Sequence, residues 1–143
     1  MKKTALFAAM ALVGLNAVAG NSPSQTMASF HAAIAVGDKQ AVMALLSPKV
    51  VIYESGHAER TREEYAKSHL QSDLEFGKVT QRKVTRQVEL AEGSTATVLA
   101  EIATSGNFKG KPIDSLGLET AVLEKSGDGW VIVHIHWSSR KSK

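Results

Sequence analysis

The pattern of apolar and polar positions changes its period once along the chain, close to residue 78. Before that point apolar residues recur every three or four positions, and after it they alternate with polar residues. The first part predicts helices over 23–36, 39–46 and 62–76, with a short strand over 50–54. Ser22 and Thr61 each begin a capping box, and Gly37 ends the first helix.

The second part predicts a meander of four longer strands, over 79–90, 96–105, 116–125 and 130–138. Short turns containing glycine separate the first two strands and the last two, whereas residues 106–114 are expected to form a longer mobile loop. Helices that precede an antiparallel meander predict an α+β domain. We therefore expect about three N-terminal helices packed on the concave side of a curved, mostly antiparallel sheet.

The N-terminus has the pattern of a Sec-type signal peptide. Lys2 and Lys3 precede a short apolar run, and Ala17-Val18-Ala19 fits the small-x-small cleavage rule. The run is too short to span a bilayer. We expect cleavage after Ala19, a single mature domain over 20–143, no membrane span after cleavage, and a periplasmic or secreted location.

Charge and composition exclude several classes of function. Without Lys2 and Lys3 the chain has 15 basic and 14 acidic residues, and no basic face or base-reading motif indicates nucleic-acid binding. The chain has no cysteine, so thiol chemistry and thiolate metal sites are excluded. It also has no P-loop or dinucleotide fingerprint. We therefore expect no organic cofactor.

The last predicted strand carries two of the five histidines. Alternation along a strand places His134 and His136 on one face with Ile132 beside them, and Trp137 on the other face. Imidazoles on an apolar strand indicate a polar site, hydrogen-bonded structural positions or a metal site. Together with His57 and His69 they could bind zinc or copper, which is the alternative to hydrogen-bonding roles.

Carboxylates and aromatic residues complete the candidate site. Glu101 and Glu119 each lie among small or apolar residues of a predicted strand, and for each one a solvent-facing position is the simpler interpretation. A histidine close to Tyr53, Glu101 or Glu119 could transfer protons near neutral pH. Tyr53 and Trp137 could also line a pocket for a small apolar ligand.

The chain resembles the SnoaL-like, nuclear-transport-factor-2-like superfamily over essentially its whole mature length, and within it a small exported subgroup. The segments that carry this resemblance are the opening helix with its Gly37-Asp38 break, Leu45–Pro48 leading into Val51–Glu54, Gly56–Arg60, Lys109–Pro112 and Gly129–Ser139. The resemblance implies a cone-shaped fold with a pocket between helices and sheet, and frequent homodimers. Relatives include isomerases, dehydratases and hydrolases as well as non-catalytic binding modules, so the fold alone does not decide the function.

The sequence therefore favours a protein that binds a small organic ligand in an apolar pocket edged by histidines. If it is an enzyme, which the sequence leaves open, we expect cofactor-free isomerisation, dehydration or hydrolysis. The candidate catalytic residues are His134, His136 and Tyr53, and the candidate ligand-binding residues are Tyr53, His57, His69, Glu101, Glu119 and Trp137. The alternatives are a periplasmic metal-binding protein, with His57, His69, His134 and His136 as ligands, and a non-catalytic accessory dimer.

Overall fold

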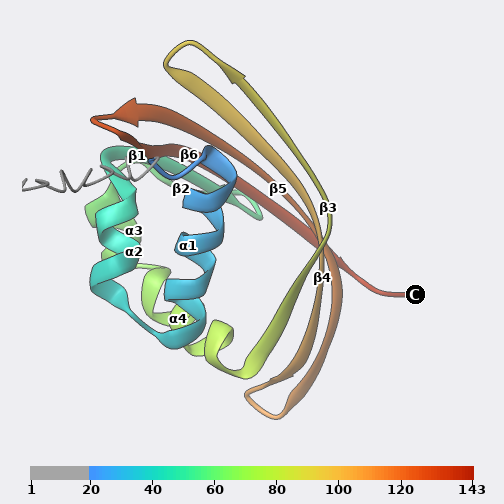
Figure 1. The fold of residues 1–143 in the computed structure, drawn as a ribbon. Helices are drawn as coiled ribbons and strands as arrows, with labels where there is room; N and C mark the ends of the chain where they lie inside the picture. Colours follow the sequence, from blue (N-terminus) through green and yellow to red (C-terminus); the bar gives the residue numbers. More distant parts are fainter. Residues whose placement is uncertain (1–19) are drawn as a thin grey trace, which may run out of the picture.

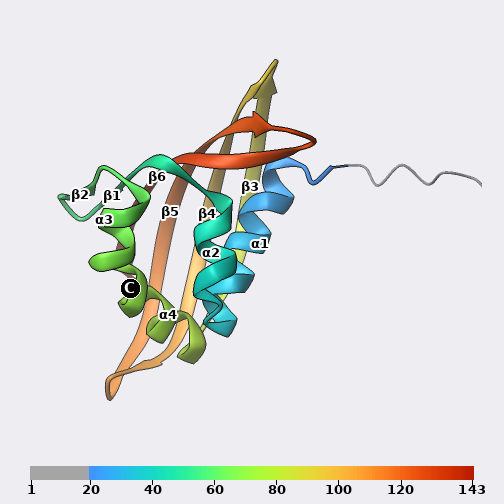
Figure 2. The same ribbon diagram turned by 90° about the vertical axis from the view of Figure 1, so that its left-hand side faces the viewer.

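Four helices cover the concave face of one curved, six-stranded sheet (Figures 1 and 2). The structure is a computed structural model that describes residues 20–143, so the predicted signal peptide over 1–19 lies outside the described residues. The elements are α1 (Pro23–Val36), α2 (Lys39–Leu45), β1 (Leu46–Glu54), β2 (His57–Glu59), α3 (Arg62–Lys67), α4 (Leu70–Val79), β3 (Thr80–Glu92), β4 (Thr95–Phe108), β5 (Lys111–Ser126) and β6 (Gly129–Lys141). The predicted α+β architecture is confirmed.

The strand order across the sheet is β2-β1-β6-β5-β4-β3. β1 and β6 run parallel, and the other neighbours are antiparallel. The meander from β3 to β6 follows chain order, so β6 lies inside the sheet between β1 and β5. This order brings the end of the chain beside the early strand β1, and it aligns their side chains in rows across the concave face.

Local sequence explains how α1 begins and ends. The Ser22 hydroxyl accepts from the backbone N–H of Gln25, and the Gln25 side chain accepts from the backbone N–H of Ser22, as a capping box requires. Pro23 occupies the first turn, where its missing N–H costs nothing. Gly37 ends the helix with a φ of 76°, a conformation that glycine adopts without a steric penalty.

The predicted third helix is two helices, because it breaks at Ser68 and His69. Both side chains bond the carboxylate of Glu59, which draws this segment toward β2 and away from regular helical geometry. The predicted loop over 106–114 is also wrong, since β4 and β5 continue into a tight hairpin at Lys109 and Gly110. Both residues have positive φ, as a two-residue hairpin turn of this kind demands.

The core fills the space between the helices and the concave face of the sheet. Met27, Phe30 and Ile34 form the buried stripe of α1, as the helical spacing predicts. Other buried apolar residues are Val42, Leu46, Val50, Ile52, Tyr65, Leu70, Leu74, Val98, Ala121, Leu123, Ile132 and Ile135. Within residues 20–143, none of the helices has the length and hydropathy needed to cross a membrane.

Candidate functional site

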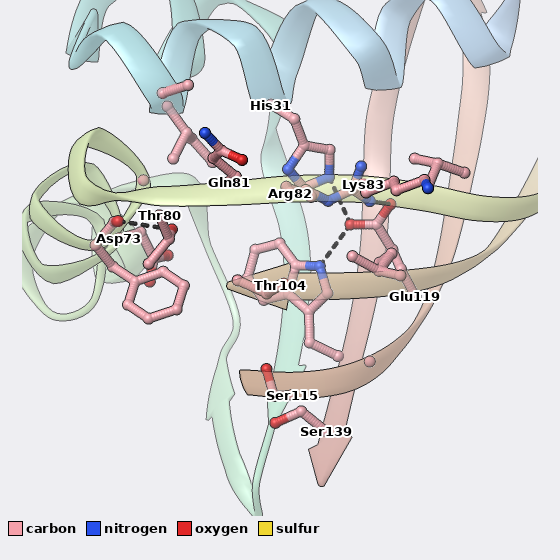
Figure 3. A pocket seen from close by; sticks show the side chains of 18 of the residues that line it. His31, Asp73, Thr80, Gln81, Arg82, Lys83, Thr104, Ser115, Glu119 and Ser139 are labelled. Atoms are coloured by element: carbon pink, nitrogen blue, oxygen red, sulfur yellow. Dashed lines mark hydrogen bonds and ion pairs between the residues drawn. The ribbon is translucent and has the colours of Figure 1, made fainter. Parts of the chain in front are cut away.

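A cavity of about 810 Å³ lies between α1, α4 and the concave face of the sheet (Figure 3). Its apolar lining includes Met27, Ala28, Ala32, Ile34, Ala35, Phe76, Val84, Ile102 and Trp137. Its ionisable lining comes from His31, Glu54, Asp73, Arg82, Lys83 and Glu119. A mostly apolar cavity with a few convergent polar groups is the usual form of a small-molecule site.

Strand register places one row of functional side chains in the wall of this cavity. Trp137 of β6 pairs with Glu54 of β1 on one side and with Glu119 of β5 on the other. Paired residues point to the same face of a sheet, so all three face the helices. Two strand spacings separate the Cα atoms of Glu54 and Glu119 by about 10 Å.

Glu119 is buried, with 3% of its surface exposed, and every described contact of its carboxylate is with a hydrogen-bond donor. Oε2 accepts from Nε1 of Trp137 at 2.6 Å and lies 2.6 Å from Nε2 of His31. Oε1 accepts from Nη2 of Arg82 at 3.0 Å. Burial would raise the pKa of Glu119, but the hydrogen bonds from His31 and Trp137, the charge of Arg82 and the charge that His31 carries when protonated together lower it. The carboxylate is therefore ionised at neutral pH.

An ionised Glu119 decides which nitrogen of His31 carries a proton. A carboxylate can only accept, so Nε2 of His31 must be the donor in this pair. In a neutral imidazole the other nitrogen, Nδ1, is then the basic one. The glutamate thus holds the imidazole in one tautomer and orientation, as carboxylates do for catalytic and metal-bound histidines. His31 lines the cavity, so its imidazole is the candidate group for proton transfer with a ligand.

A second polar cluster lies at the other side of the cavity, around Asp73 of α4 (Figure 3). The hydroxyl of the buried Tyr65 donates to Oδ2 of Asp73 at 2.6 Å. Burial raises the pKa of Asp73 to about 6, and the Tyr65 bond limits that rise. Burial also raises the pKa of Glu54, the other carboxyl group at this end.

The structure places His134, His136 and Tyr53 on the opposite, convex face of the sheet. Tyr53 of β1 pairs with His136 and packs edge-on against both imidazoles. The lining of the cavity contains none of the three residues, so they do not form the pocket floor that the sequence suggested. His134 donates from Nδ1 to the backbone oxygen of Val51 at 2.8 Å, which is a structural hydrogen bond.

An irregularity in β6 explains one error of the alternation argument. The register of β5 and β6 shifts between Val122 and Leu123, so Leu123 pairs with Ile132 while Val122 pairs with His134. Ile132 therefore turns into the core and does not lie beside the histidines. Trp137 does take the face opposite to His136, as predicted, and it is the member of this strand that reaches the cavity.

The two other histidines lie together, away from the convex-face pair. The rings of His57 and His69 are 5.7 Å apart at their centroids, in a separate shallow groove beside β2 and α3. The four histidines of the metal-binding alternative are thus split between two places. Among residues 20–143, no set of three or more His, Cys, Asp or Glu side chains is arranged to hold a metal ion.

The two candidate glutamates differ in their positions. Glu101 lies on the convex face, half-exposed and within 3.4 Å of Arg86, in agreement with the solvent-facing interpretation. The same interpretation is wrong for Glu119, because its pairing with Trp137 places it on the concave face. Strand alternation places Glu119 on the same face as the apolar residues Ala121 and Leu123, and this pattern indicated that Glu119 is buried.

Sequence reasoning missed three residues of the site, namely His31, Arg82 and Asp73. The position of His31, one helical turn after the buried Met27, was a usable signal. In the sequence, Arg82 is one of several charged residues of β3, and nothing in the pattern distinguishes it from the others. Only its pairing with Thr104 on β4 shows that it faces the cavity. Asp73 lies within the predicted helix over 62–76, but the helical pattern does not show that its carboxylate faces the cavity and accepts from Tyr65.

Comparison with known proteins agrees with this architecture. A family model described as a SnoaL-like domain matches residues 24–140. The chain belongs to the SnoaL-like domain family. A search of curated proteins gives no significant match.

Solved structures similar to this SnoaL-like domain have several described roles. A candidate ketosteroid isomerase from Shewanella frigidimarina is 36% identical, with 79% of this chain and 91% of that chain covered and a TM-score of 0.76. A candidate dehydratase of the nuclear-transport-factor-2-like family from Streptomyces avermitilis is 20% identical, covering 83% and 94%, with a TM-score of 0.72. A calcium/calmodulin-dependent kinase II hub from S. rosetta is 21% identical, covering 84% and 98%, with a TM-score of 0.68. The last two likenesses concern the fold alone.

Proposed function

We propose that this SnoaL-like domain binds a small, largely apolar organic molecule in the cavity and transfers a proton to or from it without a cofactor. The observation that carries the proposal is the contact between His31 and Glu119 in the cavity wall. It joins an oriented imidazole to an ionised carboxylate in a place mostly shielded from water. The 36% identity to a candidate ketosteroid isomerase supports the same class of chemistry.

Proton abstraction would begin at Nδ1 of His31. As this nitrogen takes a proton from a carbon or oxygen of the ligand, the imidazole becomes positively charged. Glu119, which accepts from Nε2 of the same ring, stabilises that charge. The same imidazolium can return its proton to a second atom of the ligand, which completes an isomerisation, or to a leaving hydroxyl, which completes a dehydration.

Arg82 is the candidate group for the negative charge that develops on the ligand. It contacts Glu119 through one nitrogen, while a guanidinium has five N–H donors in a fixed plane. The remaining donors can bind an oxygen of the ligand near His31. Burial lowers the pKa of Arg82, and the charge of Glu119 opposes that effect, so the guanidinium remains charged.

Deuterium exchange tests this function without knowledge of the natural substrate. We would incubate the protein in heavy water with a ketosteroid and with cyclohexanone, and follow the loss of the proton signals next to each carbonyl by NMR. We expect exchange above the buffer rate, and loss of that excess in His31→Gln. The matched control is His57→Gln, which alters an exposed histidine outside the cavity and should leave exchange unchanged. Equal exchange in wild type and His31→Gln would refute the catalytic proposal.

A non-catalytic binding protein is the second candidate function, since the apolar lining supports binding by itself. Trp137 lies in the cavity wall, whereas the second tryptophan, Trp130, does not line it, so fluorescence in a Trp130→Phe background reports occupancy. Saturable quenching by the same ketones, without any His31-dependent exchange, would favour this second function.

We also propose that two copies associate through the convex face of the sheet. One row across four strands joins Leu99, Thr120, His136 and Tyr53. Leu118 beside this row is 60% exposed and Tyr53 is 45% exposed, an unusual density of large apolar side chains on one side of a sheet. Similar folds are described as kinase hub and association domains, which is consistent with association.

The mass of the protein in solution tests this association. We expect a dimer by light scattering, and a shift toward monomer in Leu118→Lys. Val36→Lys is the control, because Val36 is also exposed but lies at the end of α1, on the helical side. A monomeric wild type would refute the proposal.

Export to the periplasm or the cell exterior remains our proposal from the sequence of residues 1–19. Expression of the full chain followed by mass determination of the released protein tests it. We expect the N-terminus at Gly20, within one residue.

A further inference from the structure

The carboxyl groups at the two ends of the cavity differ in whether a positively charged side chain is paired with them. Glu119 is paired with Arg82 and His31. Glu54 and Asp73 have no salt bridge within residues 20–143. The charged neighbours that act on Glu54 are His69, Glu59 and His57, and those that act on Asp73 are Glu54, His69 and Glu59. No lysine or arginine is among them, so this end of the cavity has an excess of negative charge.

Glu59 adds a third carboxylate behind these two. Its pairing with Ile52 and that of Glu54 with His57 place both glutamates on the concave face. The Glu59 side chain is 6% exposed. Oε1 accepts from the Ser68 hydroxyl at 3.0 Å and bonds Nδ1 of His69, but the buried Oε2 has no partner in the described chain. Glu59 lines the neighbouring groove and not the cavity itself, but its negative charge acts on both Glu54 and Asp73. An unpartnered oxygen in this buried acidic cluster shows that the described side chains do not balance its charge.

A buried carboxylate without a cation either takes up a proton or binds a positive ligand. Burial raises the pKa of Asp73 to about 6, so Asp73 is still mostly ionised at neutral pH. Tyr65 supplies one hydrogen bond to it but no positive charge. The remaining requirement at neutral pH is thus a cation that reaches Asp73 and Glu54 from the cavity.

We propose that the cavity binds an organic cation, whose protonated amine contacts Glu54 and Asp73 while its apolar body extends toward His31. This inference rests on the proposed function, because it names the ligand class of the same cavity. Phe76 and Trp137 line the cavity as well, and aromatic faces favour cationic groups. The distance of about 10 Å between the Cα atoms of Glu54 and Glu119 suits a compact molecule with an amine at one end and the reacting carbon at the other.

The structure favours an amine over a metal ion. Hard divalent cations take six or more oxygen ligands, and zinc prefers a tetrahedral set. Residues 20–143 contain no such set. An ammonium group needs only two or three acceptors, which Glu54 and Asp73 supply.

Binding of three matched probes tests the inference. We would titrate 2-phenylethylamine, 2-phenylethanol and phenylacetate, which share one apolar body and differ in charge. The readouts are the heat of binding and, in a Trp130→Phe background, the fluorescence of Trp137. We expect the amine to bind at least about tenfold more tightly than the alcohol near neutral pH, and phenylacetate to bind most weakly. Amine affinity should fall as the pH drops through about 6, because Asp73 then takes up a proton.

Substitutions locate the amine. Glu54→Gln and Asp73→Asn should each remove most of the preference for amine over alcohol, whereas Glu101→Gln on the convex face should leave it intact. If one of these two variants folds poorly, the other still tests the inference. Equal affinity of amine and alcohol in the wild type would overturn the inference. Displacement of the amine by Zn²⁺ or Mg²⁺ that depends on Glu54 and Asp73 would also overturn it, in favour of a metal.

The outcome is separable from that of the proposed function. If ketones show His31-dependent exchange but amines have no advantage, the inference falls and the proton-transfer function stands. If amines bind through Glu54 and Asp73 but no exchange depends on His31, the ligand class stands and the catalytic proposal falls.

Discussion

Nε2 of His31 and Oε2 of Glu119 lie 2.6 Å apart although 88 positions separate the two residues in the chain. The contact links α1 to β5 across the concave face, and Trp137 of β6 donates to the same oxygen. One carboxylate thus connects the first helix with the two central strands of the sheet. Its loss should affect both the stability of the fold and the chemistry of the cavity.

Glu119→Ala should lower the free energy of unfolding by about 3 kcal/mol, since it leaves the buried donors of His31, Trp137 and Arg82 without an acceptor. Urea unfolding at neutral pH measures the loss. The matched control is Glu101→Ala, because Glu101 lies on the exposed face of the neighbouring strand and its removal should change the free energy by less than about 0.5 kcal/mol. Equal losses in the two variants would show that the buried contacts contribute little.

Trp137→Phe keeps most of the ring volume but removes the N–H that donates to Glu119. We expect a loss of about 1.5–3 kcal/mol, the range for a hydrogen bond to a charged group. The pKa of Glu119 should rise in this variant because one of the groups that lower it is gone. Glu119 stabilises the fold only while it is ionised, so acid unfolding should begin at a higher pH than in the wild type. An unchanged acid midpoint, measured by circular dichroism, would argue against this role of Trp137.

The fold could be predicted from the sequence because its determinants are local. The capping box at Ser22 and the buried stripe of Met27, Phe30 and Ile34 define α1 without any tertiary information. The alternation of the last four strands and their short turns likewise define the meander. Of the elements that the sequence misjudged, the break at Ser68 and His69 depends on a distant partner, Glu59 on β2. The tight hairpin at Lys109 and Gly110 is local, and its turn residues were a signal that the alternation pattern did not use.

The site was less predictable because it depends on register. A strand sequence indicates which residues share a face, but not whether that face meets the helices or the solvent. His134 and His136 share a face as predicted, yet that face is convex, while Glu119 pairs with Trp137 on the concave one. His31 and Asp73 come from helices that contact the sheet only in the folded chain. Their roles follow from distances to Glu119 and Tyr65, which the sequence does not contain.

Gly106→Ala should be strongly destabilising, by about 2 kcal/mol or more. Gly106 lies in β4 with a φ of 151°, and an added Cβ would lie 2.5 Å from the backbone oxygen of Val79 and 2.9 Å from Cα of Thr80. Backbone atoms cannot move aside as a flexible side chain can. Gly127→Ala is the control, since Gly127 also has positive φ but no atom lies within 4 Å of its added Cβ. It should cost only about 1 kcal/mol, the conformational penalty alone. Thermal unfolding of the two variants distinguishes steric conflict from backbone strain.

Asp73→Asn should change how stability depends on pH. Asp73 has a pKa of 3.8 as its ordinary value and about 6 in the folded protein, chiefly because it is buried. The folded state therefore binds the Asp73 proton more tightly than the unfolded state does, and this contribution to stability decreases as the pH rises from about 4 to about 6. The difference amounts to about 2–3 kcal/mol, and it is absent in Asp73→Asn, whose side chain does not ionise. The variant should thus gain stability relative to the wild type as the pH rises through this range. Urea midpoints at a series of pH values measure the difference in stability between the variant and the wild type. The titrations of Glu54, Glu59 and His69 contribute to both proteins, so their effects largely cancel in this difference. A difference that stays constant between about pH 4 and 7 would show that Asp73 is not the buried acid that the structure describes.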